Sequence, residues 1–139
     1  MAAGGQTPVG LIAGPRGLWF ALLGTDTAGT GTFGLLNGND QFEFFHLSSD
    51  IGARASLLHL AFDSDADTNH ALWLLSSSII KNDAIDAVFK ITFDDEWENI
   101  ISEEVIEIPT QACWAHRLLS TPTNLFATEL TSSKVLTIF

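Results

Sequence analysis

The sequence has little positive charge and no long apolar run. Six of its 139 residues are lysine or arginine, whereas 17 are aspartate or glutamate, and the net charge is −11. A nucleic-acid ligand requires a basic surface, so we expect no nucleic acid among the partners. No apolar segment reaches the roughly 18 residues that a membrane span requires, so we also expect no membrane partner.

Cysteine is nearly absent, and the first residues lack the features of a secretory signal. The single cysteine, Cys113, cannot form an internal disulfide, which fits a reducing compartment. Residues 1–6 contain neither a basic region nor an apolar region. These features predict a cytoplasmic protein, and the 46% of hydrophobic residues predict a globular one.

An apolar pattern repeats along the chain about every 53 residues. The segment GLWFALL at residues 17–23 returns as ALWLLSS at residues 71–77, and in weaker form as NLFATEL at residues 124–130. Such a period indicates stacked units, each of which needs a neighbour to bury its apolar face.

Turn residues divide each unit into short strands. Glycine, proline, asparagine and aspartate separate the apolar runs, as at residues 14–17 and 37–40. The expected strands are residues 9–13, 17–23, 31–36, 42–47, 57–62, 71–76, 87–93, 104–108, 115–119, 124–130 and 134–139. The sequence therefore predicts an all-β protein.

Four strands per unit, with an aromatic residue in the second strand, are typical of a β-propeller. We expect a single partial propeller with about three four-stranded blades, at residues 8–50, 54–110 and 111–139, the last of them incomplete. In this arrangement Trp19 and Trp73 pack between neighbouring units. A β-sandwich is the alternative, because short strands separated by turns occur in both folds.

Three blades do not close a ring, since propellers have about four to eight. An open array would expose apolar sheet faces and a bare strand edge. We therefore expect other polypeptide to complete a six-bladed ring, either a second copy of this chain or a complementary propeller chain.

Short motifs in all three units resemble the blade pattern of virginiamycin B lyase-like propellers. The motifs are PVGLI at residues 8–12, Gly14, LWF at residues 18–20, ALW at residues 71–73, AIDAVFKIT at residues 84–92, IEIPT at residues 106–110, AHRL at residues 115–118 and LFATE at residues 125–129. The resemblance covers most of the chain and implies the propeller fold. Fold alone does not fix activity.

The resemblance also implies functional positions. In that family a histidine near the first strand acts in catalysis or metal binding, and a glutamate three residues after the aromatic holds magnesium. Here His116 and Glu129 match these positions, whereas Leu22 and Ser76 occupy the glutamate position of the other units and Trp114 replaces a further glutamate. The histidine position falls near Ser56 in the second unit.

Most of the implied ligand set is therefore missing. Hard cations need several oxygen ligands, so one carboxylate and one imidazole do not make a magnesium site. We expect no metal and no other cofactor. Mg²⁺ is the one ion that the resemblance to the lyase family implies. A stretch with the start of a calcium loop, residues 63–67, lacks the later ligands and is interpreted as a solvated hairpin loop.

The substituted positions predict an apolar substrate. If they line a central mouth, Leu22, Ser76 and Trp114 make it largely apolar and aromatic. His116, Glu129 and Arg117 would be the polar groups that orient a small apolar molecule there.

The favoured hypothesis is an enzyme of specialised, natural-product metabolism, of lyase or cyclase type. An elimination would use His116 as general acid or base, with Glu129 as its partner. A cyclisation, including a hetero-Diels–Alder reaction, would depend on holding the substrate in one folded shape. The alternative is a non-catalytic propeller module that binds a ligand or a protein.

Overall fold

The computed structural model describes residues 7–23, 31–49, 51–52, 55–80, 83–108, 115–129 and 135–137. This part of the chain is all-β apart from one short helix, which confirms the predicted class. Its elements are β1 (Thr7–Gly14), β2 (Gly17–Leu23), β3 (Thr32–Asn37), β4 (Phe42–His46), β5 (Ser56–Phe62), α1 (Ala66–Asn69), β6 (Ala71–Ile80), β7 (Asp83–Phe93), β8 (Ile100–Glu107), β9 (Ala115–Ser120), β10 (Leu125–Glu129) and β11 (Val135–Thr137).

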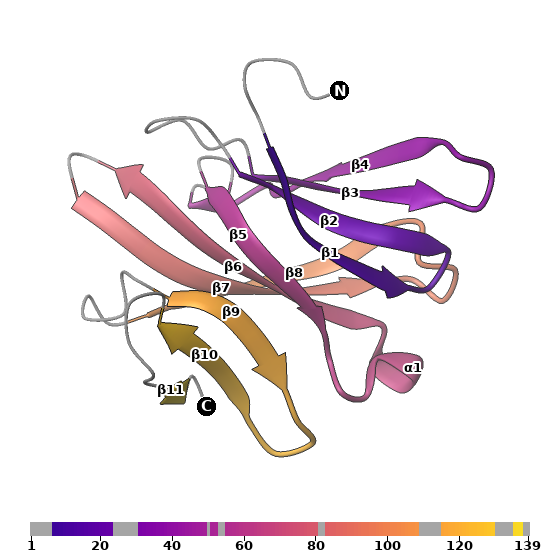
Figure 1. The fold of residues 1–139 in the computed structure, drawn as a ribbon. Coiled ribbons are helices and arrows are strands. Elements are labelled where there is room, and N and C mark those ends of the chain that lie inside the picture. Colours follow the sequence, from indigo (N-terminus) through magenta and orange to yellow (C-terminus); the bar gives the residue numbers. More distant parts are fainter. Residues whose placement is uncertain are drawn as a thin grey trace.

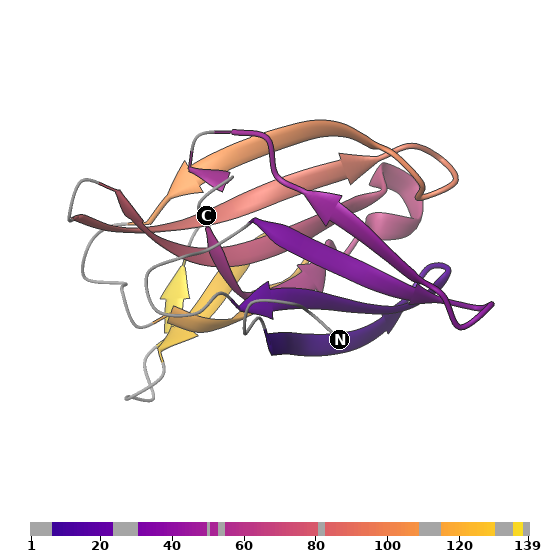
Figure 2. The ribbon, with the colours of Figure 1, turned by 90° about the horizontal axis from the view of Figure 1, so that it is seen from above.

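The strands form three antiparallel sheets, one for each predicted unit. The first sheet has the order β1-β2-β3-β4, the second β5-β6-β7-β8, and the third β9-β10-β11. Each strand pairs with its neighbour in the sequence. Figure 1 shows the second sheet between the first and the third, and Figure 2 shows the pronounced twist of its strands.

The first strands of the second and third sheets contact the preceding sheet. Strand β5 packs against β1 and β2, and strand β9 packs against β5 and β6. Since successive side chains in a strand point to opposite faces, β6 can serve two interfaces at once. Leu72 and Leu74 belong to the core between the first and second sheets, whereas Trp73 and Leu75 belong to the core between the second and third.

The core between the first two sheets is built around Trp19, whose side chain is fully buried. Its ring stacks on Phe45 and meets Phe62, Phe93 and Trp97 at steep angles, with ring centroids 5.5 to 6.0 Å apart. Edge-to-face and offset contacts of this kind are favourable for aromatic rings. The prediction that Trp19 lies between two units is confirmed.

The core between the second and third sheets is smaller. It contains Trp73, Leu75, Val88, Ile108, Leu118 and Leu125. Trp73 is 3% exposed and therefore also lies between two units, as predicted. These two cores fix the relative positions of the three sheets and of the residues on their first strands.

Candidate functional site

A β-bulge interrupts the first strand of every sheet. The pairing of β1 with β2 shifts between Val9 and Ile12, and that of β5 with β6 shifts between Leu57 and His59. In β9 the shift leaves one residue, His116, outside the regular pairing. Bulges bend a strand and re-aim its side chains, and they occur frequently beside active sites.

The second and third sheets share one register around their bulges. Trp73 pairs with Ala61 in the second sheet, and Phe126 pairs with Leu119 in the third. Counted from these pairs, His116 occupies the position of Leu58, two residues after the expected Ser56. Arg117 then occupies the position of His59, and Glu129 that of Ser76, the latter as the sequence predicted.

The backbone brings three of the predicted site residues together. Glu129 pairs with Ala115 and Thr128 pairs with Arg117, so the His116 bulge lies directly across from the end of β10. For these three predicted site residues the structure describes the backbone alone. Trp114 lies outside the described residues.

Leu22 and Ser76 lie on the second strands of the other two sheets, at the positions that correspond to Glu129. Leu22 is 3% exposed and Ser76 is fully buried. The Ser76 hydroxyl donates a hydrogen bond of 3.1 Å to the carbonyl oxygen of Ala87 on β7. In the described structure both side chains are thus packed inside, and the serine hydroxyl already has an acceptor.

His59 links the three first strands. Its Nδ1 accepts a hydrogen bond of 3.2 Å from the backbone N–H of Leu118 on β9. On its other side lies Gly10 of β1, where an added Cβ would be 3.2 Å from the His59 ring carbon Cδ2. Gly10 also has a φ of +65°, a conformation that favours glycine. The sequence showed this histidine but gave no sign of its position between two neighbouring strands.

Asp86 is a buried carboxylate that the sequence reasoning missed. It is 6% exposed, and its Oδ1 has no hydrogen-bond partner among the residues that the structure describes. Burial raises its pKa, although a hydrogen bond from Ser77 opposes this effect. By strand alternation Asp86 lies on the same face of β7 as Val88, toward the third sheet. The available signal was an acidic residue between apolar neighbours, in the run Ala84-Ile85-Asp86-Ala87-Val88.

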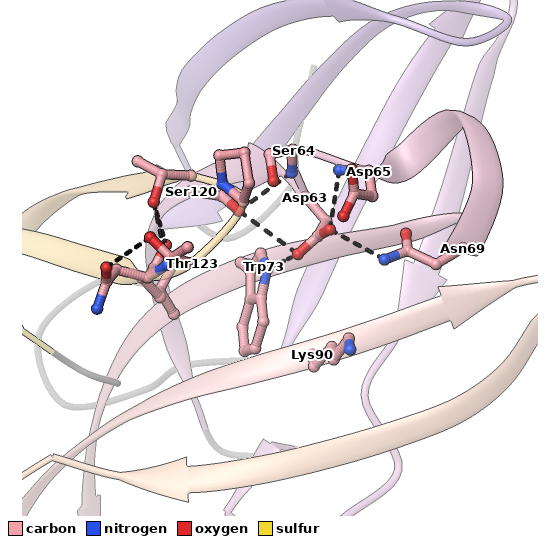
Figure 3. A pocket seen from close by; sticks show the side chains of 12 residues that line it. Asp63, Ser64, Asp65, Asn69, Trp73, Lys90, Ser120 and Thr123 are labelled. Carbon is pink, nitrogen blue, oxygen red and sulfur yellow. Dashed lines mark hydrogen bonds between the residues drawn. The ribbon is translucent and has the colours of Figure 1, made fainter.

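A polar cavity of about 180 Å³ lies where the β5–α1–β6 connection meets the β9–β10 turn. Asp63 is its central residue (Figure 3). Its Oδ1 accepts hydrogen bonds from Trp73 Nε1 at 2.9 Å and from the Ser120 hydroxyl at 3.4 Å. Its Oδ2 accepts from Asn69 Nδ2 at 2.9 Å and from the backbone N–H of Asp65 at 3.0 Å.

These contacts decide the charge state of Asp63. Burial by itself would raise the pKa of this carboxyl, but the hydrogen bonds from Trp73, Asn69 and Asp65 outweigh it and lower the pKa. Lys90 adds a smaller favourable charge, and its Nζ lies 5.6 Å from the centre of the Trp73 ring. Asp63 is the first carboxylate of the calcium-like loop, and both of its oxygens already accept hydrogen bonds from protein donors.

The cavity joins two sheets. Besides the Ser120 hydroxyl, which bonds Asp63, the backbone N–H of Ser64 donates to the Ser120 oxygen at 3.1 Å. Pockets for drug-sized ligands enclose about 300–1,000 Å³, so this cavity is small for such a molecule. Its arrangement fits a polar junction between the second and third sheets.

In the described residues, no group of three or more histidine, cysteine, aspartate or glutamate side chains is placed to hold a metal ion. No helix in the same part of the chain is long and apolar enough to cross a membrane. A comparison with protein-family models and with curated proteins found no match.

Proposed function

We propose that this chain is part of a β-propeller enzyme that acts on a small apolar molecule by elimination or cyclisation. The observation that carries the proposal is the bulge at His116, across from Glu129, on the strand that packs against the neighbouring sheet. A bulge can turn a side chain out of the regular pairing and toward a ligand.

The stacking of the sheets supports the propeller part of the proposal. Each sheet is an antiparallel meander whose strands follow one another in sequence. The first strands of the three sheets lie next to one another, since β5 contacts β1 and β9 contacts β5. In a propeller the first strands of successive blades surround the central channel, so the bulge at His116 would lie beside that channel.

In an elimination, His116 would act as the general base. Its imidazole would remove a proton from the carbon next to the one that bears the alkyl oxygen of the ester. The alkyl carbon–oxygen bond would break, and the electron pair of the C–H bond would form a carbon–carbon double bond. The acyl part of the ester leaves as a carboxylate, and Arg117 would stabilise the negative charge of that carboxylate. Glu129 would hold the imidazole in the tautomer with a free ring nitrogen.

In a cyclisation, no proton needs to be transferred. The site would hold a reactive chain in one folded shape, which lowers the barrier through proximity and orientation. A hydrogen bond from Arg117 or His116 to a carbonyl oxygen would polarise the reacting system.

A panel of apolar macrocyclic lactones, monitored by liquid chromatography with mass spectrometry, tests the elimination. The ring-opened product of elimination is an isomer of the substrate, whereas hydrolysis adds one water. We expect His116→Ala to lower turnover by about 10²- to 10⁴-fold, the usual contribution of general acid–base catalysis. His46→Ala is the matched control, because His46 lies on β4 and bonds Thr32 at 2.9 Å. Equal turnover of His116→Ala and the wild type would remove this histidine from the mechanism.

A non-catalytic module that binds a ligand or protein is the second candidate. It is favoured by the packing of Leu22 and Ser76, which are enclosed rather than exposed in the described structure. For this candidate we expect saturable ligand binding without any isomeric product from the lactone panel.

A further inference from the structure

The first sheet has an apolar face that no other described element covers. On this sheet Trp19 and Ala21 face the second sheet, so their strand neighbours face the other way. Four apolar side chains of this outer face are exposed: Leu11 at 63%, Leu18 at 39%, Phe42 at 57% and Phe44 at 49%. Contiguous exposed apolar surface of this kind marks interaction sites.

The outer face is continuous across the strands of the sheet. Leu18 pairs with Leu36, which pairs with Phe42. One step further along, Phe20 pairs with Gly34 across the sheet. Gly34 leaves space for the ring of Phe20, since a Cβ there would lie 2.7 Å from that ring.

The phenylalanine rings fill this surface. Phe42 and Phe44 stack with their centroids 6.1 Å apart. The ring of Phe20 meets both of them edge to face, at 5.9 and 6.2 Å. Phe20 itself is only 4% exposed, so the two outer rings provide the accessible surface.

The repeat shows what covers such a face. Leu72 and Leu74 of the second sheet occupy the positions of Leu18 and Phe20, because each pair is counted from its strand's tryptophan. Both leucines are fully buried, and the first sheet covers them with the cluster around Trp19. The outer face of the first sheet thus corresponds to a face that is covered by a preceding sheet elsewhere in the same molecule.

The third sheet presents the complementary side of this contact. Phe126 occupies the position of Trp19, and its neighbour Leu125 is buried against the second sheet. By strand alternation Phe126 and its partner Leu119 face away from that sheet. Leu119 is 60% exposed. The chain therefore carries a covering face at one end and a face that needs covering at the other.

We propose that a second copy of this chain supplies the missing contact, with the third sheet of each copy packed on the first sheet of the other. Two such contacts, related by a twofold axis, would close six sheets into a ring. A second copy is favoured over a different chain because this chain itself presents both sides of the contact. The proposal is independent of the catalytic role of His116.

Native mass spectrometry and sedimentation of the 139-residue chain measure the assembly directly. We expect a discrete species at twice the chain mass of 15.0 kDa. Because each copy carries a net charge of −11, the copies repel one another, and raised salt should strengthen the dimer.

Substitutions at the two ends separate the two sides of the contact. We expect Phe44→Ser and Leu119→Ser each to weaken dimerisation by about tenfold or more, as for exposed apolar anchors at an interface. Ile101→Ser is the matched control. Ile101 is 65% exposed but lies on β8 of the middle sheet, so the dimerisation constant of this variant should equal that of the wild type. Circular dichroism and urea unfolding establish that each variant keeps its fold.

Mixing the two end variants gives the sharpest result. In a mixed pair, the intact third sheet of Phe44→Ser meets the intact first sheet of Leu119→Ser, so one contact is restored. The other contact then carries both substitutions, but losses within one contact are less than additive when the two groups touch. The mixture should therefore dimerise more tightly than the average of the two variants taken separately. A dimer through two copies of the first-sheet face would instead be insensitive to Leu119→Ser, and mixing would not help Phe44→Ser.

Three results would overturn the proposal. These are a monomer at all concentrations and salt conditions, a series of open oligomers instead of a discrete dimer, and a mixture that associates no better than the average of its components. A folded wild-type dimer that converts none of the lactones would contradict the catalytic proposal alone. A wild-type protein that stays monomeric but converts a lactone would contradict the dimer proposal alone.

Discussion

Replacing Asp63 by alanine should destabilise the junction between the second and third sheets. The carboxylate accepts hydrogen bonds from Trp73, Asn69, Ser120 and the backbone of Asp65. The change removes all four acceptor contacts at once. It leaves the Trp73 indole N–H without this acceptor in a side chain that is 3% exposed.

The expected loss of unfolding free energy is about 2–4 kcal/mol. Removing the acceptor of a buried donor costs about 1–3 kcal/mol, and the Trp73 indole N–H loses its Asp63 acceptor in this variant. Each lost hydrogen bond from Asn69 and Asp65 adds at most about 1 kcal/mol, because Asp63 is only partly buried and water can replace it. The Ser120 contact, at 3.4 Å, contributes least.

Urea unfolding of a double-mutant cycle measures the indole contribution. Trp73→Phe removes the N–H together with part of the ring, and the double variant lacks both donor and acceptor. The double variant should lose less unfolding free energy than the sum of the two single variants, by about 1–2 kcal/mol, since the two groups are in contact. Asp65→Ala is the control: its backbone N–H remains, its side chain is exposed, and its effect should stay within about 0.5 kcal/mol.

The pH dependence of Asp63→Ala provides an independent check. The pKa of Asp63 is lowered in the folded state, so its charged form stabilises the fold above the unfolded pKa of about 3.9. This contribution disappears as the pH falls through the folded pKa. The difference between wild type and Asp63→Ala should therefore shrink in acid. Additive losses in the cycle, together with a difference that does not change with pH, would refute the reasoning.

Two further substitutions test the first strands and the buried acid. Gly10→Ala should destabilise by about 1–2 kcal/mol in urea unfolding, because it places a Cβ at φ +65° and against His59, whereas Gly38→Ala, with open space around it, should be close to neutral. Asp86→Asn should be neutral or stabilising at neutral pH. The raised pKa of Asp86 means that the folded state prefers the protonated acid, so its contribution is fully present below the unfolded pKa and is lost as pH rises through the folded pKa. The gain from Asp86→Asn should hence vanish near pH 4, and a gain that is equal at both pH values would contradict the assignment.

Much of the fold could be predicted from the sequence. Strand positions followed from apolar runs separated by turn residues, and the places of Trp19 and Trp73 followed from their recurrence in each unit. Both signals are local or periodic, so they can be identified in the sequence without knowledge of the packing. The short helix Ala66–Asn69 was missed, because a single turn of four polar and small residues carries no periodic signal.

The candidate site could be predicted only in part. His116, Arg117 and Glu129 were identified from a motif, and the pairing of β9 with β10 brings their backbones together. The corresponding histidine position in the second unit was placed two residues too early, since a bulge changes the count along a strand and leaves no mark in composition. The positions of His59 and Asp86 depend on neighbours from other strands.

The sequence by itself determined the strands, their order in antiparallel sheets and the burial of Trp19 and Trp73, because these depend on neighbouring residues and on the repeat. The tertiary structure decided which carboxylate is satisfied and which is not. Asp63 meets donors from β6, α1 and the end of β9, whereas Asp86 is buried with one unpaired oxygen among the described residues. The structure also decided which apolar faces are covered, because burial of a sheet face depends on the sheet packed against it and not on its own residues.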